Sequence, residues 1–140
     1  MERIKINQLK EKVGKKVLIK GFVHELRDQS KVKFVLIRDN SGIIQTVTTP
    51  DKKNIFSKII KIPKESVVSI EGEVKKSEKA PDGIEIHVDK YEVLSEAEQP
   101  LPIDMSDFSK TNIDKRLDWR CLSLRTKKSR AIFKIQAKII

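Results

Sequence analysis

The chain of 140 residues is basic, with 30 Lys and Arg against 20 Asp and Glu and a net charge of +10. This length allows one domain of ordinary size with an appendage, and its core needs neither disulfides nor metals. The single cysteine, Cys121, excludes an intrachain disulfide and a cysteine-rich zinc site and suits a reducing compartment.

Three strands are predicted in the first part of the chain. Val17–Leu26 has the apolar pattern of a long strand, with Gly21 where a barrel strand bends. Val32–Arg38 and Ile43–Thr48 follow as the two strands of a hairpin, joined by a polar turn at Asp39–Gly42.

A helix and two further strands complete this region. Apolar residues at helical spacing predict a short amphipathic helix over Lys52–Lys61, which Pro63 ends. Val67–Lys75 and Ile84–Leu94 are predicted as the fourth and fifth strands, separated by a polar loop at Ser77–Gly83. Five strands with a helix between the third and the fourth is the order of an oligonucleotide-binding (OB) barrel, whose binding surface centres on strands 2 and 3. We therefore predict an all-β, five-stranded OB-fold barrel followed by a C-terminal linker and helix.

The hairpin register places an aromatic ring close to a side-chain amide. If Arg38 pairs with Ile43, then Phe34 and Gln45 are diagonal neighbours on one face, within reach of a long side chain. A ring that covers an unpaired base and an amide that contacts its Watson–Crick edge need neither a metal nor a catalytic group. The alternative is an ordinary barrel-core ring beside a polar residue on a solvated strand.

The pattern does not decide which face of the hairpin packs into the core, because both faces are apolar. One face carries Val35, Ile37 and Ile44. The other face carries Phe34, Leu36, Ile43 and Val47.

The composition changes after Ser95. The acidic and proline-containing segment 96–102 predicts a boundary, which divides the chain into domains 1–96 and 97–140. Asp104–Asp118 is too polar for a core element and is predicted as an ordered linker with little regular structure. From about Lys128 we predict a helix with an uncovered apolar face made of Ala131, Ile132, Ile135, Ile139 and Ile140.

Positive charge gathers at the two ends of the chain. Residues 1–38 carry a net charge of +7, residues 39–100 carry −3, and residues 101–140 carry +6. A polyanionic partner fits this distribution, and a solvated lysine-rich surface is the alternative. No apolar run approaches the roughly 18 residues of a membrane span, and the charged first residues do not resemble a signal peptide. We therefore expect a cytoplasmic protein with no membrane partner.

These motifs resemble one known family. Gly21-Phe22-Val23, Phe34, Arg38-Asp39 and Gln45 resemble the N-terminal anticodon-binding barrel of aspartyl-tRNA synthetases, particularly the archaeal and eukaryotic kind. The likeness continues into the hinge and first catalytic-domain helix of that family, over Leu101-Pro102, Ile113–Thr126 and Ala131–Gln136. The ordered set spans nearly the whole chain and is more specific than any single motif in it.

The resemblance implies that the chain binds the anticodon loop of tRNA as part of an aspartate–tRNA ligase, whose reaction is the ATP-dependent aspartylation of tRNA. It implies no enzyme activity and no cofactor for this chain, because the family binds ATP and magnesium through motifs that follow the first catalytic-domain helix. In the family that helix lies at the dimer interface, so a homodimer or a contact with a catalytic domain is a further expectation. No metal site is predicted, since His24 and His87 have no suitable partners at a recognisable spacing.

The resemblance also assigns roles to residues of the barrel. Phe34 matches the ring that stacks on the central anticodon base, and Gln45 matches the amide that contacts this base, a uridine. Glu85 resembles a glutamate that contacts the third base, where a carboxylate accepts from a cytosine amino group; the alternative is a surface pair with His87. Arg27 lies near the position of a basic residue at the first base or its phosphate.

Two further residues, Lys33 and Arg38, flank Phe34 in the sequence. They are expected to make either phosphate contacts or structural ion pairs. The asparaginyl and lysyl enzymes share the barrel and also recognise a central anticodon uridine, so Phe34 and Gln45 do not distinguish them from the aspartyl enzyme. The hinge sequence over 116–126 favours the aspartyl enzyme.

Two positions depart from the family pattern. Ser123 stands where the family usually has Asp, and Trp119 replaces a smaller or polar residue. These departures keep two alternatives open. One is a stand-alone single-strand binding OB protein without tRNA preference, and the other is a synthetase-interacting paralogue that pairs through its tail helix.

Overall fold

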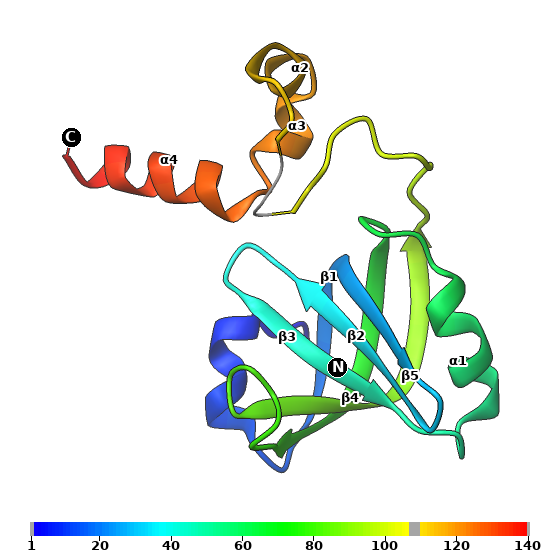
Figure 1. The fold of residues 1–140 in the computed structure, drawn as a ribbon. Coiled ribbons are helices and arrows are strands. Elements are labelled where there is room, and N and C mark those ends of the chain that lie inside the picture. Colours follow the sequence, from blue (N-terminus) through cyan, green and yellow to red (C-terminus); the bar gives the residue numbers. More distant parts are fainter. Residues whose placement is uncertain (1, 107–109, 140) are drawn as a thin grey trace. The chain divides into compact units, whose positions relative to one another are not determined.

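Five strands close into a barrel in a computed structural model that describes residues 2–106 and 110–139 (Figure 1). The strands are β1 (Lys16–Gln29), β2 (Val32–Arg38), β3 (Ile43–Thr48), β4 (Val67–Lys76) and β5 (Ile84–Ser95). They close in the order β1-β2-β3-β5-β4, and every neighbouring pair is antiparallel except the parallel pair β3–β5. This order confirms the predicted OB-fold barrel.

The hairpin of β2 and β3 has the predicted bounds and register. Arg38 lies opposite Ile43 and Phe34 lies opposite Val47. The pairing predicted from the alternation along the two short strands and from the polar turn is therefore confirmed.

Other elements differ slightly from the prediction. β1 begins one residue earlier and continues past Leu26 to Gln29, because its last residues pair with β2 as the exposed arm of a hairpin. The single helix predicted at Lys52–Lys61 consists of α1 (Lys53–Lys58) followed by a 3₁₀ turn, η2 (Ile59–Lys61). A 3₁₀ turn is common at the end of a short helix.

The turn between β2 and β3 anchors a segment that the sequence pattern did not reveal. Asp39 Oδ1 accepts hydrogen bonds from the backbone N–H groups of Ser41 and Gly42 at 2.6 and 2.9 Å, and Oδ2 accepts from that of Ile6 at 3.0 Å. Ile6 begins a 3₁₀ helix, η1 (Ile6–Lys12), which packs its apolar residues into the core. Burial raises the pKa of Asp39, but hydrogen bonds from the Ser41 hydroxyl and these N–H groups outweigh it, so the pKa is lowered.

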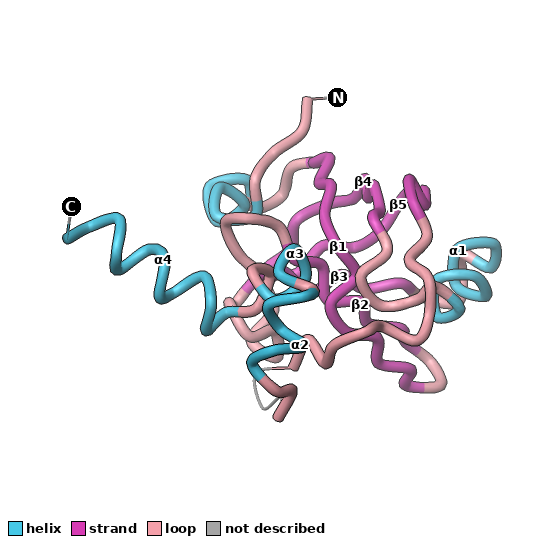
Figure 2. The backbone as a smooth tube through the Cα atoms, turned by 90° about the horizontal axis from the view of Figure 1, so that it is seen from above, coloured by secondary structure: helices cyan, strands magenta, loops and turns pink. Residues whose placement is uncertain are grey.

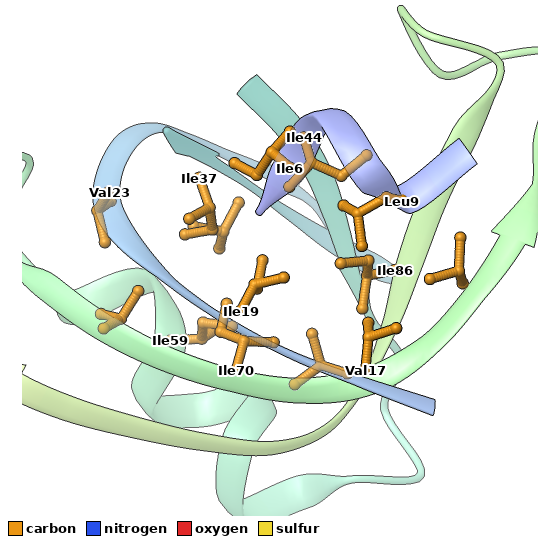
Figure 3. Close-up of a cluster of buried hydrophobic side chains, with 14 of the residues drawn as sticks. Ile6, Leu9, Val17, Ile19, Val23, Ile37, Ile44, Ile59, Ile70 and Ile86 are labelled. Atoms are coloured by element: carbon orange, nitrogen blue, oxygen red, sulfur yellow. The ribbon is translucent and has the colours of Figure 1, made fainter. Parts of the chain in front are cut away.

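The core takes the hairpin face that carries Val35, Ile37 and Ile44. Figure 3 shows branched side chains from all five strands, η1 and η2 in one cluster. η1 and α1 lie on opposite sides of the strands in both backbone views (Figures 1 and 2). Phe34 is not part of this cluster and is only partly buried. The structure therefore decides between the two faces that strand alternation left open.

A buried ion pair lies beside the core. The Arg38 guanidinium donates to both carboxylate oxygens of Glu65 at 2.9 and 2.8 Å, and the two side chains are 5% and 3% exposed. Glu65 has a φ of 68°, and its N–H donates to the carbonyl of Val23 at 2.7 Å. A non-glycine residue in this region is strained, so the ion pair and the hydrogen bond together hold Glu65 in place.

Residues 98–140 form a second unit, which is described by itself. Its helices are α2 (Ile113–Asp118), α3 (Arg120–Ser123) and α4 (Lys127–Ile139). The prediction of little regular structure over Asp104–Asp118 is wrong at α2. The short helix was missed because its apolar residues, Ile113 and Leu117, are only one helical turn apart, and both are exposed.

The tail helix α4 confirms the prediction and leaves apolar residues uncovered. Ile132, Ile135 and Ile139 are exposed, while Ile140 lies outside the described residues. None of the helices in the described part of the chain is long and apolar enough to cross a bilayer.

Hydroxyl groups hold the start of α4. Thr126 Oγ1 accepts from the Ser129 backbone N–H at 3.4 Å, as a residue capping a helix does. Arg116 donates to the hydroxyls of Ser123 and Ser129 at 3.2 and 2.9 Å. The departure from the family pattern at Ser123 therefore still provides an acceptor for Arg116.

Candidate nucleic-acid interface

Two rows of side chains cross the outer face of four strands. One row across β1, β2, β3 and β5 consists of Arg27, Phe34, Val47 and His87. The next row, two residues along each strand, consists of Glu25, Leu36, Gln45 and Glu85. Because side chains two apart on a strand share a face, both rows face the same way. The structure thus brings together four of the predicted site residues, Arg27, Phe34, Gln45 and Glu85.

Phe34 offers an aromatic face outside the core. Its ring is partly exposed, whereas Leu36 and Val47 on the same face are buried. Val35, the next residue of β2, is fully buried in the core on the other side of the strand. A partly exposed ring on a rigid strand is a suitable platform for an unpaired base.

A hydrogen-bonded chain of three polar side chains lies next to this ring. Gln45 Nε2 donates to Glu85 Oε2 at 3.2 Å, and His87 Nε2 lies 3.0 Å from Glu85 Oε1. Gln45 is 8% exposed, and the side chains of Glu85 and His87 are 14% and 35% exposed. The pairing of β3 with β5 aligns Gln45 with Glu85 and creates this group.

Arg27 is held at the edge of the face by Glu25. The guanidinium donates through Nε and Nη2 to the two carboxylate oxygens at 3.1 and 3.0 Å. This hydrogen bonding by Arg27 lowers the pKa of Glu25 against the opposing effect of burial, with a smaller contribution from the charge of Lys64. Both side chains of the pair are well exposed, so Arg27 remains accessible to a phosphate or a base.

Lys33 lies on the other face of β2, and Arg38 follows Leu36 on the outer face but is buried. Lys33 Nζ lies 3.6 Å from Asp28 Oδ2 and 4.4 Å from the centre of the Phe56 ring on α1. Arg38 is buried in its ion pair with Glu65. Of the two roles expected for these residues, the structural ion pair is the one seen for both.

Sequence reasoning missed the part that Glu25 and His87 play in the geometry. The sequence excludes His87 as a metal ligand and allows a surface pair with Glu85, and the two do form a pair. Their connection to Gln45 depends on the parallel pairing of β3 with β5, for which the sequence contains no local signal. In the described part of the chain, no group of three His, Cys, Asp or Glu residues is arranged to hold a metal ion.

Lysines cluster in the segment that joins β3 to β4. Residues 52–64 contain five lysines and no acidic residue. Lys64 is close enough to influence Glu25 electrostatically, and Phe56 contacts Lys33. Lys64 therefore adds positive charge near Glu25, whereas Lys52 is paired with Asp89 on β5.

Comparison with known families agrees with this arrangement. A family model for tRNA anti-codon domains, described as an OB-fold nucleic acid binding domain, matches residues 17–94. The aspartate–tRNA(Asp/Asn) ligase of Methanopyrus kandleri is 44% identical over 128 residues, which are 90% of this chain and 30% of that protein. The aspartate–tRNA(Asp) ligase of Pyrococcus furiosus is 42% identical over 137 residues, 95% of this chain and 31% of that protein. The chain thus spans about a third of the length of these relatives.

Solved structures show the same similarity. The asparaginyl-tRNA synthetase of Pyrococcus horikoshii, complexed with asparaginyl-adenylate, has a TM-score of 0.88 at 35% identity, covering 98% of this chain and 32% of that one. An OBody bound to hen egg-white lysozyme has a TM-score of 0.57 at 27% identity and covers 62% of this chain but 86% of its own.

Proposed function

Because this chain belongs to the tRNA anti-codon family of OB-fold nucleic acid binding domains, we propose that it binds the anticodon loop of a tRNA on behalf of an aspartate–tRNA ligase. The observation that carries the proposal is the pair of rows on the outer face, which sets the Phe34 ring beside the Gln45 amide and the Glu85 carboxylate. An unpaired base needs a stacking surface and a polar group at its edge. Similarity to two aspartate–tRNA ligases, at 42% identity or more over at least 90% of this chain, supports the same conclusion.

Each residue has a specific part in the proposal. Phe34 stacks on the central anticodon base, and Gln45 contacts the edge of that base, a uridine. Glu85 accepts from the amino group of a cytosine at the third position, for which a carboxylate with two oxygens retains free lone pairs. Arg27 contacts the first base or its phosphate. Lys33 contributes positive charge from the side of the face, and we assign Arg38 to the stability of the barrel because it is buried.

We assign recognition to this segment, and the ATP- and magnesium-dependent aspartylation of tRNA to the rest of such a ligase. We favour an aspartate ligase because the two relatives above are named as aspartate ligases, one for tRNA(Asp/Asn) and one for tRNA(Asp). The cytoplasm is the proposed compartment, because one cysteine suits a reducing environment. The exposed apolar residues of α4 are proposed to be covered by a second copy or by a catalytic domain.

Titration with anticodon stem-loops tests the proposal. The protein should bind a stem-loop that carries the aspartate anticodon more tightly than one in which the central uridine is replaced. Gln45→Ala should weaken binding less than removal of the ring does and should reduce the preference for uridine. An unstructured oligonucleotide with the same loop sequence is the control. Equal affinity for the stem-loop and this oligonucleotide would contradict a tRNA role and favour a general single-strand binding protein.

A further inference from the structure

The orientation of the Gln45 amide is determined by its surroundings. An ionised carboxylate only accepts hydrogen bonds, so the NH₂ group of Gln45 must face Glu85 Oε2, 3.2 Å away. The opposite orientation would place two acceptor oxygens in contact. The positions of the amide nitrogen and oxygen of Gln45 are therefore assigned from their hydrogen-bond partner.

The same reasoning applies to His87. Its Nε2 lies 3.0 Å from Glu85 Oε1, so this nitrogen carries the proton and donates a hydrogen bond to the carboxylate. Each oxygen of Glu85 thus accepts one side-chain donor. Glu85 is held from one side by His87, and it holds Gln45 on the other.

The carbonyl oxygen of Gln45 is the polar atom left for a ligand. In the part of the chain that the structure describes, no group donates a hydrogen bond to Gln45 Oε1. The buried side-chain atoms without a partner there are Thr48 Oγ1 and Tyr91 OH, so Gln45 Oε1 is not fully buried. The oxygen therefore keeps access to solvent on the face that carries Phe34. A carbonyl oxygen at this place accepts from an N–H group and repels an acceptor.

We propose that Glu85 and His87 are positioning residues that lock Gln45 with its carbonyl oxygen toward the RNA, so that the site selects a base with an N–H donor at its Watson–Crick edge. This inference rests on the proposed function. Uracil has such a donor between two carbonyl groups, whereas the ring nitrogen of cytosine at the same place is an acceptor. Selection of uridine over cytidine then comes from the fixed direction of one amide.

Stem-loops that differ only in a central uridine or cytidine test the lock. Glu85→Gln removes the charge but keeps the shape, and it allows the Gln45 amide to turn. We expect the ratio of uridine to cytidine affinity to fall by about three- to tenfold, the value of one hydrogen bond. Glu92→Gln is the matched control, because Glu92 is an exposed carboxylate on the same strand, and it should keep the wild-type ratio.

Two substitutions test the part of His87. His87→Ala should reduce the same ratio, and His87→Gln should largely restore it, because a glutamine amide can donate to Glu85. An unchanged ratio in His87→Ala overturns the role of His87. An unchanged ratio in both Glu85→Gln and His87→Ala, with binding retained, overturns the lock and leaves the proposed function standing.

A measurement on the free protein separates the two proposals. Solvent exchange of the Gln45 side-chain amide protons, followed by NMR, should be at least about tenfold slower than that of the exposed Gln29. Glu85→Gln should remove this protection. If wild type binds no stem-loop, the proposed function fails, and the exchange measurement alone tests whether Glu85 and His87 fix the Gln45 amide. Equal exchange rates for Gln45 and Gln29 would contradict a fixed amide.

Discussion

Replacing Phe34 by alanine should separate RNA binding from folding. The ring is partly exposed and lies outside the core cluster, so its contribution to stability is that of a cross-strand pair with Val47. Such a pair contributes up to about 1 kcal/mol, compared with about 3–5 kcal/mol for a phenylalanine within a core. A change of about 1 kcal/mol corresponds to roughly 4–8 °C in the melting temperature of a domain of this size.

The effect on binding should be larger. Loss of one stacked base costs about 1–3 kcal/mol of binding free energy, which raises the dissociation constant by roughly 5- to 150-fold. Calorimetric titration with the aspartate anticodon stem-loop measures this change, and thermal melting measures the change in stability. Phe133→Ala is the control, because this exposed ring on α4 belongs to the second unit of the chain and not to the proposed site.

Two results would refute this reasoning. Equal affinity of wild type and Phe34→Ala would remove Phe34 from the site. A fall in melting temperature well beyond 8 °C would show that the ring supports the core and that the weaker binding follows from unfolding.

Three other predictions concern charge and domain structure. Affinity should fall with salt, with a slope of about −0.7 per phosphate neutralised, and a slope near zero would mean that the net charge of +10 only aids solubility. Because the pKa of Asp39 is lowered from 3.8 in the folded state, its carboxylate stabilises the barrel above the unfolded-state pKa, and this contribution is lost as pH falls through the folded-state pKa. Urea denaturation between about pH 6 and pH 2 should therefore show a smaller loss of unfolding free energy for Asp39→Asn than for wild type. A chain that ends at Arg125 should keep cooperative unfolding and RNA affinity, and sedimentation should show that any self-association is lost. Loss of the cooperative unfolding transition would show that the predicted boundary near residue 96 is wrong.

The sequence predicted the hairpin well because the information there is local. Alternation along β2 and β3 and the turn that begins at Asp39 determine which residues lie opposite each other. Alternation alone did not identify the core face, since Leu36 and Val47 are buried on the outer face as well. Their burial arises from the tertiary structure around the hairpin, which no short pattern encodes.

Other features were missed because they depend on distant contacts. η1 has little helical pattern, and its position follows from the hydrogen bond between Ile6 and Asp39. Glu65 adopts a conformation that favours glycine, and its distant contacts with Arg38 and Val23 hold it there. The pairing of β2 with β3 predicts Phe34 and Gln45 as neighbours, whereas the link from His87 through Glu85 to Gln45 depends on the order of the strands in the closed barrel.

The parallel pairing of β3 and β5 has a consequence for the folding of this barrel. Gln45 and Glu85 are 40 residues apart, and their strands meet without a hairpin to guide them. Contacts of such long sequence separation are slow to form, because chain entropy is lost before the contact is gained. The proposed RNA face therefore does not exist in a partly folded chain that has formed only the β1–β2–β3 meander. An RNA that binds this face binds only the closed barrel. Its binding free energy should therefore stabilise the closed barrel, with β3 paired to β5, against the partly folded chain.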